Sequence, residues 1–552
     1  MSRVIFDIQP PAPQIDTRRA DVACFVGLAR VLSGATLSAG IQGWLQPLGY
    51  APAQMVTLTN VPIPVESYAA FTALFDDGTS DQAFGTDYLA TAVRSFFAQG
   101  GKKCYVVRVG DPLTRTDQAS EKSAKWLAVL GAAAPNVLGT LDDGPAAWTG
   151  VAALGALEEV SLLATPDLPA LCASAPVGAV GQIPYVNLGP QEFTPCTPGP
   201  VIPQQQRTFQ APAPRLTAAD YTTWATNIAN VVNYLSSGIM RHQLHLREIQ
   251  LVAAFPLPHD LDPATAAETT SSSEIAADIR DYINTVMPEQ APPGGFCLPN
   301  NISSAFLQLA YPWLKTTGSV VLLEQLEAPD GVLVGLLARN ALTRGTFTSA
   351  TRIVPAEVYD VSTVLPAQET RTPKAQLPWD VPIATPRPLI ERLSLFGPTP
   401  SGLRLLSDVT AWPGEGNRSG PVNRLTAVIL RAARIMGERA VFQANDAALW
   451  GKVQRFMGNL LTRLWTLNAL DGATASDAFK VRCDRTTMTQ NDLDRGLLVA
   501  YVSFTPAATL ETITVQLYLE PGGTSAGEIA TNLGESPAMY GTASAGSTAG
   551  AY

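Results

Sequence analysis

Apolar and polar residues repeat at two different periods along this chain. "DVACFVGLARV" from Asp21 is a nearly continuous apolar run, which predicts a buried strand. "YLATAVRSFFAQ" from Tyr88 repeats its apolar positions every three to four residues and predicts a helix, and "CYVVRV" from Cys104 predicts the next strand. "VLVGLLA" from Val332 is apolar throughout and is interpreted as a further buried strand. Buried strands between amphipathic helices indicate an α/β fold.

The last third of the chain has the most regular pattern. Two helices are predicted, one from Gly420 and a longer one from Asn445, and three strands follow them. Along the first and last of these strands, apolar residues alternate with polar ones, which indicates an antiparallel sheet covered on one side. The alternating apolar positions of the last strand are Ile513, Val515, Leu517 and Leu519.

The two ends of the chain differ in composition from the rest. Residues 1–22 are rich in proline, and Val4, Phe6 and Ile8 alternate with Ile5 and Asp7, which predicts a short strand on an extended arm. Residues 521–552 are poor in charge and rich in Gly, Ser, Ala and Thr, which predicts a flexible tail.

Basic residues gather on the two C-terminal helices. Spaced at 100° per residue, Lys452, Arg455, Asn459 and Arg463 share one face of the second helix, opposite its apolar side. The first helix adds Arg431 and Arg434. A solvated helix face explains the periodicity equally well, whereas the functional interpretation is a basic surface directed at an acidic partner.

The overall composition argues for a cytosolic protein with protein partners. The formal net charge is -10, which makes nucleic acid an unexpected partner. Only 15% of the residues are charged, which suggests that other subunits cover much of the surface. The N-terminal stretch lacks the apolar core of a signal peptide, and no apolar run is long enough to insert into a membrane. The six cysteines are scattered without a Cys-x-x-Cys pair, as expected of free thiols in a reducing compartment.

Motifs for catalysis and cofactors are not found. The turn Gly100-Gly101-Lys102-Lys103 follows a helix and precedes a strand, the reverse of a phosphate-binding loop, and the P-loop spacing fails. His242 and His245 are three residues apart, but no further ligand lies nearby at a zinc-site spacing. We therefore expect no catalytic residue, no metal and no cofactor.

The C-terminal run from "VNRLTAVILRAARIMGERAVFQANDAALWGKVQRFMG" through "AFKVRCD" to "TITVQLYLE" resembles the contractile tail sheath family of phage tails, pyocins and extracellular contractile injection systems. "YLATAVRSFFAQGGKKCYVVRV" and "APDGVLVGLLARNALTRGTFTSA" are similar to upstream landmarks of that family. The resemblance covers about two thirds of the chain.

This resemblance implies a structural subunit that polymerises into a helical sleeve around an inner tube. The sleeve contracts and drives the tube through a target cell envelope. The implied partners are many copies of the chain itself, the inner tube protein, and baseplate and cap or terminator proteins. The tube would face the basic residues of the C-terminal domain, while the two alternating strands near the chain ends would complete the sheets of neighbouring subunits.

The resemblance also implies a multi-domain α/β (α+β) fold with a C-terminal helix-plus-antiparallel-sheet domain. The chain is expected to begin with an arm (1–22), followed by an outer α/β domain (23–172), an inserted outer region (173–300) and the second part of the outer domain with a linker (301–388). A tube-facing domain (389–520), which includes an arm strand (505–520), and a tail (521–552) are expected to complete it.

Two other functions stay open. One is a sheath-related tail terminator or cap, and the other is an α/β enzyme whose site the motifs do not reveal. Assembly is expected in the bacterial cytoplasm, in a phage tail or a phage tail-like particle, and the sequence does not separate these two.

Overall fold

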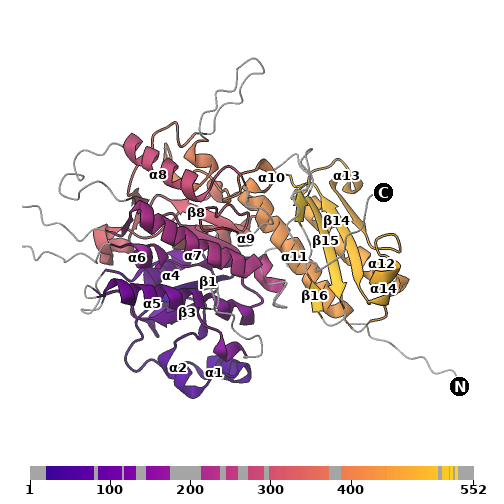
Figure 1. The fold of residues 1–552 in the computed structure, drawn as a ribbon, viewed down its shortest axis with the longest axis horizontal. Helices are drawn as coiled ribbons and strands as arrows, with labels where there is room; N and C mark the ends of the chain where they lie inside the picture. Colours follow the sequence, from indigo (N-terminus) through magenta and orange to yellow (C-terminus); the bar gives the residue numbers. More distant parts are fainter. Residues whose placement is uncertain are drawn as a thin grey trace, which may run out of the picture.

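An eight-stranded sheet organises the larger of two lobes (Figure 1). The structure is a computed structural model that describes residues 20–79, 85–114, 117–131, 144–174, 213–236, 244–258, 272–290, 297–371, 387–441, 443–507, 513–520, 523–525 and 529–531, the last three ranges for the backbone alone. The smaller lobe holds the C-terminal helices and an antiparallel sheet, so the expected α/β fold class with a helix-plus-antiparallel-sheet domain is confirmed in outline.

The main sheet is doubly wound. Its strand order is β12-β11-β8-β6-β4-β1-β3-β2, with the inner six strands parallel and the two edge strands antiparallel to their neighbours. β1 pairs with β3 on one side and with β4 on the other, so the direction of winding reverses there. The strands are β1 (Ala23–Leu28), β2 (Pro62–Val65), β3 (Cys104–Gly110), β4 (Leu162–Ala164), β6 (Gln250–Ala254), β8 (Leu307–Tyr311), β11 (Ser394–Thr399) and β12 (Gly402–Leu405).

Side chains alternate along each strand and build a core on either face of the sheet. From β1, Cys24 and Val26 enter one core, and Ala23 and Phe25 enter the other. The first core is covered by α5 (Ala119–Leu130), α6 (Leu168–Cys172), α7 (Ala218–Ser236) and α8 (Ser272–Val286). The second is covered by α3 (Tyr68–Thr72), α4 (Tyr88–Ala98) and α9 (Asp330–Thr343).

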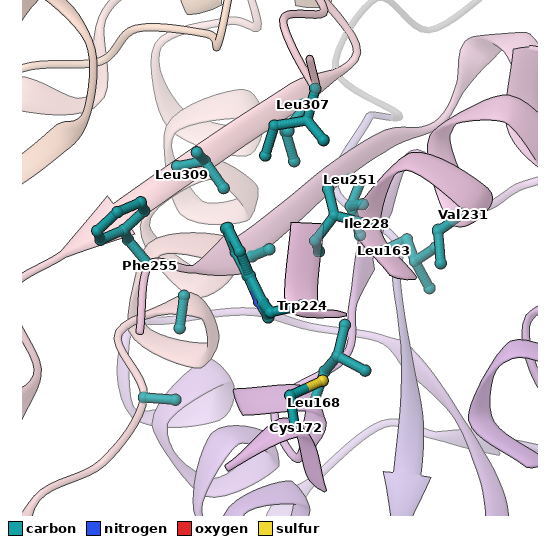
Figure 2. Close-up of a cluster of buried hydrophobic side chains, with 14 of the residues drawn as sticks. Leu163, Leu168, Cys172, Trp224, Ile228, Val231, Leu251, Phe255, Leu307 and Leu309 are labelled. Atoms are coloured by element: carbon teal, nitrogen blue, oxygen red, sulfur yellow. The ribbon is translucent and has the colours of Figure 1, made fainter. Parts of the chain in front are cut away.

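Helix α7 shows how the first core is filled. Figure 2 places Trp224 of α7 among Phe255, Leu309 and Leu168, and the indole is fully buried. A buried aromatic ring of this size contributes more than any aliphatic neighbour to the apolar area removed from water. α7 is therefore an integral layer of the α/β lobe.

The interpretation of "VLVGLLA" as a strand is wrong, because this segment lies in helix α9. The stretch from Val332 to Ala338 is buried throughout and contains no polar residue, so its helical period is hidden. An added Cβ at Gly331 would lie 2.5 Å from the Ala92 Cα, and one at Gly335 would lie 2.8 Å from the Phe96 carbonyl oxygen. Helices α9 and α4 therefore approach each other at these glycines.

The sheet also corrects two expected domain boundaries. Residues 173–300 are not simply an insertion, because β6 is a central strand of the main sheet, although 175–212 lie outside the described residues. The C-terminal domain does not begin at residue 389, because β11 and β12 extend the same main sheet. The smaller lobe begins instead with α11 (Gly420–Ala440).

The C-terminal lobe packs two helices on one antiparallel sheet. Its core joins apolar residues of α11 and α12 (Ala447–Thr466) with those of β14, and Phe306 and Phe347 of the larger lobe pack against it. The strand order is β13-β14-β15-β16, with β17 also paired to β15. The strands are β13 (Phe479–Arg482), β14 (Leu498–Phe504), β15 (Ile513–Glu520), β16 (Gly523–Ser525) and β17 (Ile529–Thr531), so two short strands lie inside the expected tail.

Short elements complete the described parts of the chain. They are α1 (Ala39–Leu45), α2 (Pro52–Thr57), α10 (Glu415–Arg418), α13 (Ala475–Ala478) and α14 (Gln490–Asp494), with the strand pairs β5 (Arg215–Leu216) with β7 (Leu257–Pro258) and β9 (Leu314–Thr316) with β10 (Val358–Val361). Among the described helices, none has the length and apolar character needed to cross a membrane.

Candidate functional site

Helix α12 presents the predicted basic face to solvent. Lys452, Arg455, Asn459 and Arg463 are all exposed, as the helical spacing predicts. The helix itself contains no acidic residue, and Lys452 and Arg463 are eleven residues apart, which spans about 16 Å along the axis. These exposed basic side chains form a positively charged strip on α12, a helix of the smaller lobe (Figure 1).

The opposite side of α12 fixes the helix to its domain. Val453, Met457, Leu460 and Leu464 are buried in the C-terminal core. The helix begins at the N-cap Asp446, whose carboxylate accepts a hydrogen bond from the Leu449 N–H at 2.9 Å. The basic face therefore lies on a rigid helix rather than on a loop.

Arg431 and Arg434 do not belong to this exposed strip, which corrects their grouping with α12. They lie on α11, which is placed between the two lobes (Figure 1), and their side chains are 13% and 6% exposed. Both guanidinium groups point toward the α/β lobe and form ion pairs there. The physical reason is the position of α11, which packs on both lobes and leaves little of its surface to solvent.

The two arginines share one buried carboxylate, that of Glu248. Arg431 Nε donates to Glu248 Oε2 at 3.0 Å, and Arg434 Nε donates to Oε1 at 2.7 Å. Arg431 also donates to the Val160 carbonyl and the Ser161 hydroxyl at 2.9 Å each. Arg434 reaches Glu438 on its own helix at 2.8 Å. We call Arg431, Arg434 and Glu248 the junction cluster, because it joins α11 to the α/β lobe.

A second buried ion pair holds the start of α11. Arg424 donates from Nη1 and Nη2 to the two carboxylate oxygens of Asp408, at 3.0 and 2.7 Å, and both side chains are buried. Asp408 also accepts from Gln308 Nε2 and from the Ala350 N–H. Burial alone would raise the pKa of Asp408, but the Arg424 guanidinium holds it below its usual value.

Of the two histidines considered as zinc ligands, only His245 lies in the described part of the chain. His245 is buried in the 3-10 helix η6 (Leu244–Glu248), and its Nε2 lies 3.1 Å from the Leu154 carbonyl oxygen. His242 and His259 lie outside the described residues. Within the described part of the chain, no group of three or more His, Cys, Asp or Glu side chains is arranged to hold a metal ion.

A second set of buried carboxyl groups lies near the reversal point of the sheet. Asp167 Oδ2 accepts from the Leu28 N–H at 2.7 Å, whereas one oxygen each of Asp87, Asp167 and Asp330 is buried without a hydrogen-bond partner. Burial raises the pKa of these groups, to about 6 for Asp87, about 8 for Asp167 and about 7 for Asp330. Among the described lysines and arginines, none forms an ion pair with these three groups, so they differ from the paired charges of α11.

The strand residues proposed to reach neighbouring subunits are described only in part. β15, which contains Ile513, Val515, Leu517 and Leu519, pairs in this chain with β14 on one side and with β16 and β17 on the other. Val4, Phe6 and Ile8 lie outside the described residues. Ala20 to Val22 are buried, so the expected arm 1–22 ends before Ala20.

One feature of the sequence indicates the junction cluster, namely the spacing of the arginines on α11. Arg424, Arg431 and Arg434 are separated by seven and three residues, so they fall on one face of α11. The opposite face carries Leu425 and Ile429, which pack in the C-terminal core. A helix that has an apolar face and a separate arginine face can be buried on both faces, provided that the surface packed against the arginines supplies carboxylate groups. Glu248 and His245 could not be assigned, because only the fold brings them to α11.

Comparisons with solved structures relate this fold to contractile particles. A search of family models and a search of curated proteins each gave no match. A chain of the anti-feeding prophage baseplate, 6-fold symmetrised, aligns with TM-score 0.51 and 17% identity over 92% of this chain and 94% of that chain. A chain of the anti-feeding prophage helical sheath in the contracted state aligns with TM-score 0.50 and 18% identity over 92% and 95%.

These alignments include both lobes and leave little of either chain unmatched. At such low identity they establish shared architecture rather than shared chemistry. They confirm the resemblance drawn from the C-terminal run at the level of the fold: this chain has the fold of a contractile tail sheath protein.

Proposed function

We propose that this chain is a sheath subunit that polymerises into a helical sleeve around an inner tube and contracts to drive the tube through a target envelope. The observation that carries the proposal is the alignment of 92% of the chain with 95% of a helical sheath chain. Its role is structural, with the chain itself, an inner tube protein, and baseplate and cap proteins as partners. Assembly takes place in the cytoplasm, before release of a phage tail or phage tail-like particle.

The basic strip of α12 is the proposed contact with the inner tube. Lys452, Arg455 and Arg463 are exposed on a helix without acidic residues, in a chain with a net charge of -10. A localised positive surface on an acidic protein favours a partner with a negative surface. Exposed charges of this kind are screened by salt, so the contact is reversible, as a sheath that separates from its tube requires.

Strand β15 and the N-terminal arm are the proposed links between subunits. An extended segment that adds to the sheet of a neighbour gains backbone hydrogen bonds, each worth about 0.5–1.5 kcal/mol net. Val4, Phe6 and Ile8 carry the alternation that such a segment needs. Because each subunit of a helical lattice repeats these hydrogen bonds, their total contribution to the stability of the assembly is large.

A baseplate-proximal or terminator role is the second candidate function. The observation that favours it is the alignment with a chain of a baseplate structure, which has the same coverage of this chain as the sheath alignment. The two functions differ in copy number, because a sleeve needs many stacked rings and a terminator forms a single ring.

Negative-stain electron microscopy of the protein expressed alone tests the proposal. Hollow, striated cylinders support the sheath role. Isolated rings of one layer support the terminator role, and globular monomers at high concentration and in the presence of the co-expressed tube protein contradict both.

A further inference from the structure

A cavity of about 220 Å³ lies at the carboxyl edge of the main sheet. Its wall includes Leu257, which follows β6, and Tyr311, the last residue of β8. Doubly wound sheets bind their ligands beyond the carboxyl ends of the parallel strands. At the reversal point of this sheet, a Cβ on Gly27 would clash with Asp167 Oδ2, so a protein carboxyl group occupies that position. The cavity lies farther along the same edge.

Charges of both signs line this cavity. Arg215 and Lys315 are its cations, and Glu324 is its carboxylate. Arg215 Nη1 donates to the two Glu324 oxygens at 3.2 and 3.1 Å, and Lys315 Nζ donates to Asp360 Oδ2 at 3.0 Å. The side chains of Arg215, Glu324 and Lys315 are 27%, 28% and 33% exposed. A ligand can therefore reach all three charges at a place from which water is partly excluded.

The turn that carries Glu324 has an unusual backbone conformation. Glu324 and Gln325 have φ angles of 52° and 56°, in the left-handed region that favours glycine. The Ser319 hydroxyl holds this turn by donating to the Gln325 carbonyl oxygen at 2.6 Å. Non-glycine residues held in this region cluster at functional sites. The chain thus keeps a carboxylate at the cavity in spite of backbone strain.

The rest of the wall is largely apolar and sets the size of the ligand. Leu257, Pro258, Ile275 of α8 and Leu326 supply this surface. A cavity of about 150 Å³ binds benzene, so one of this size takes a molecule of about nine non-hydrogen atoms, the size of leucine. The other residues of the wall carry hydroxyl groups, namely Tyr311, Ser362 and Thr363.

We propose that this cavity binds a free α-amino acid with an apolar side chain. The ligand carboxylate binds Lys315 and Arg215, its ammonium group binds Glu324, and its side chain packs on the apolar wall. Glu324 can keep Arg215 while it accepts from the ligand, because a carboxylate has about four lone-pair sites. This inference concerns the α/β lobe alone and does not depend on the sheath role.

The arrangement of charges separates a zwitterion from simpler ligands. A carboxylic acid without an amino group uses the two cations but is repelled by Glu324. An amine without a carboxylate uses Glu324 but is repelled by Arg215 and Lys315. Of these three classes, the zwitterion alone has a favourable partner for every charge of the wall.

Isothermal titration calorimetry of the full chain with three matched probes tests the inference. L-leucine carries both charges, isocaproate lacks the ammonium group, and isoamylamine lacks the carboxylate. Because each analogue loses a charge-assisted contact and meets a like charge, L-leucine should bind at least about tenfold more tightly than either.

Variants of the charged residues identify which contact each probe uses. Glu324→Gln should weaken L-leucine at least about tenfold, whereas isocaproate should bind equally well or more tightly, because its repulsion is removed. Lys315→Met should weaken both. Lys125→Met is the matched control, since it removes another partly buried lysine paired with an aspartate, Asp117, outside the cavity wall, and should leave L-leucine binding unchanged.

Two results with the wild-type protein would overturn the inference. One is the absence of binding by L-leucine, L-valine and L-methionine at about 10 mM, where a site with a Kd of about 1 mM is about nine-tenths filled. The other is equal affinity for L-leucine and isocaproate, because Glu324 would then play no part. Neither comparison needs a variant, so a folding defect in Glu324→Gln does not prevent the decision.

Discussion

Among the described residues, some buried carboxyl groups are paired with arginines and others are not. Arg424 with Asp408, and Arg431 and Arg434 with Glu248, are paired and hydrogen-bonded. Asp167 is buried with one oxygen lacking a partner. Paired charges fix a geometry more than they add stability, whereas an unpaired buried carboxyl group favours its protonated form.

Removal of the Asp408 charge should destabilise the protein strongly. In Asp408→Asn, the amide replaces one of the two oxygens that bind Arg424, and it leaves a buried guanidinium without its counter-charge. Breaking a buried pair in this way costs about 3–5 kcal/mol. Asp360→Asn, which removes a partially exposed pair with Lys315, should cost about 0–1 kcal/mol. Denaturant unfolding of the three proteins checks this, and equal losses would contradict it.

Asp167→Asn should stabilise the protein, and more so at alkaline pH. Because burial raises the folded-state pKa of Asp167 to about 8, above its unfolded value, the native state loses stability as the pH rises through that range. Asparagine keeps an acceptor for the Leu28 N–H but cannot ionise. The gain should be on the order of 1–3 kcal/mol at pH 9 and smaller at pH 6. Thermal unfolding of the wild type and the variant at both pH values measures this gain in stability. An equal gain at pH 6 and pH 9 would contradict the prediction.

At the scale of elements, α11 and α12 have the same amphipathic pattern but different surroundings. α12 buries one face and exposes the other, so its spacing predicted both the helix and the exposed Lys452, Arg455 and Arg463. α11 buries two faces, so its arginines could not be placed from its own sequence. α9 shows the same limit, because its stretch from Val332 to Ala338 is buried on every side and has no polar residue to reveal the helical period.

Several elements with a regular apolar pattern or a clear boundary were predictable. The helix at Tyr88, the strand at Cys104 and the alternating strand at Phe479 lie where the pattern places them. The topology was not predictable in the same way, since the pairing of β6 with β4 and β8 depends on contacts between distant segments. The prediction that residues 173–300 form an inserted region was incorrect for this reason, because it could not anticipate the position of β6 in the sheet.

Reversal of charge on the α12 strip should impair assembly on the tube without affecting the folding of the subunit. The triple variant Lys452→Glu, Arg455→Glu, Arg463→Glu changes only exposed side chains, so the thermal midpoint should stay within a few degrees of wild type. Extended assembly on the co-expressed tube protein should be impaired more than the formation of contracted cylinders. Lys480→Glu with Arg482→Glu on β13 is the matched control, since these are exposed basic residues of the same lobe. Equal effects of the triple variant on both assemblies would mean that the strip is simply solvated.

At the scale of the whole molecule, one helix connects two lobes that have separate hydrophobic cores. The C-terminal core lies between α11, α12 and the β13–β14 strands, and the two cores of the larger lobe lie on either side of its sheet. The lobes meet at the two buried ion-pair groups of α11. Separation of the two lobes would therefore break both buried ion-pair groups.

Deletion of residues 2–18 should leave a folded subunit that does not polymerise. The deletion spares the buried Ala20 to Val22, which precede β1, so the unfolding midpoint should be unchanged. Without Val4, Phe6 and Ile8, the proposed link to a neighbouring sheet is lost. Sedimentation velocity measures this directly, and wild-type assembly by the truncated chain would refute the arm assignment.

The most direct test of the sheath account is a helical reconstruction by cryo-electron microscopy of the polymer formed by the purified protein. The account predicts a hollow helix in which the C-terminal lobe forms the inner wall and Lys452, Arg455 and Arg463 of α12 face the lumen. A polymer whose inner wall is formed by the α/β lobe, with α12 on the outer surface, would contradict it.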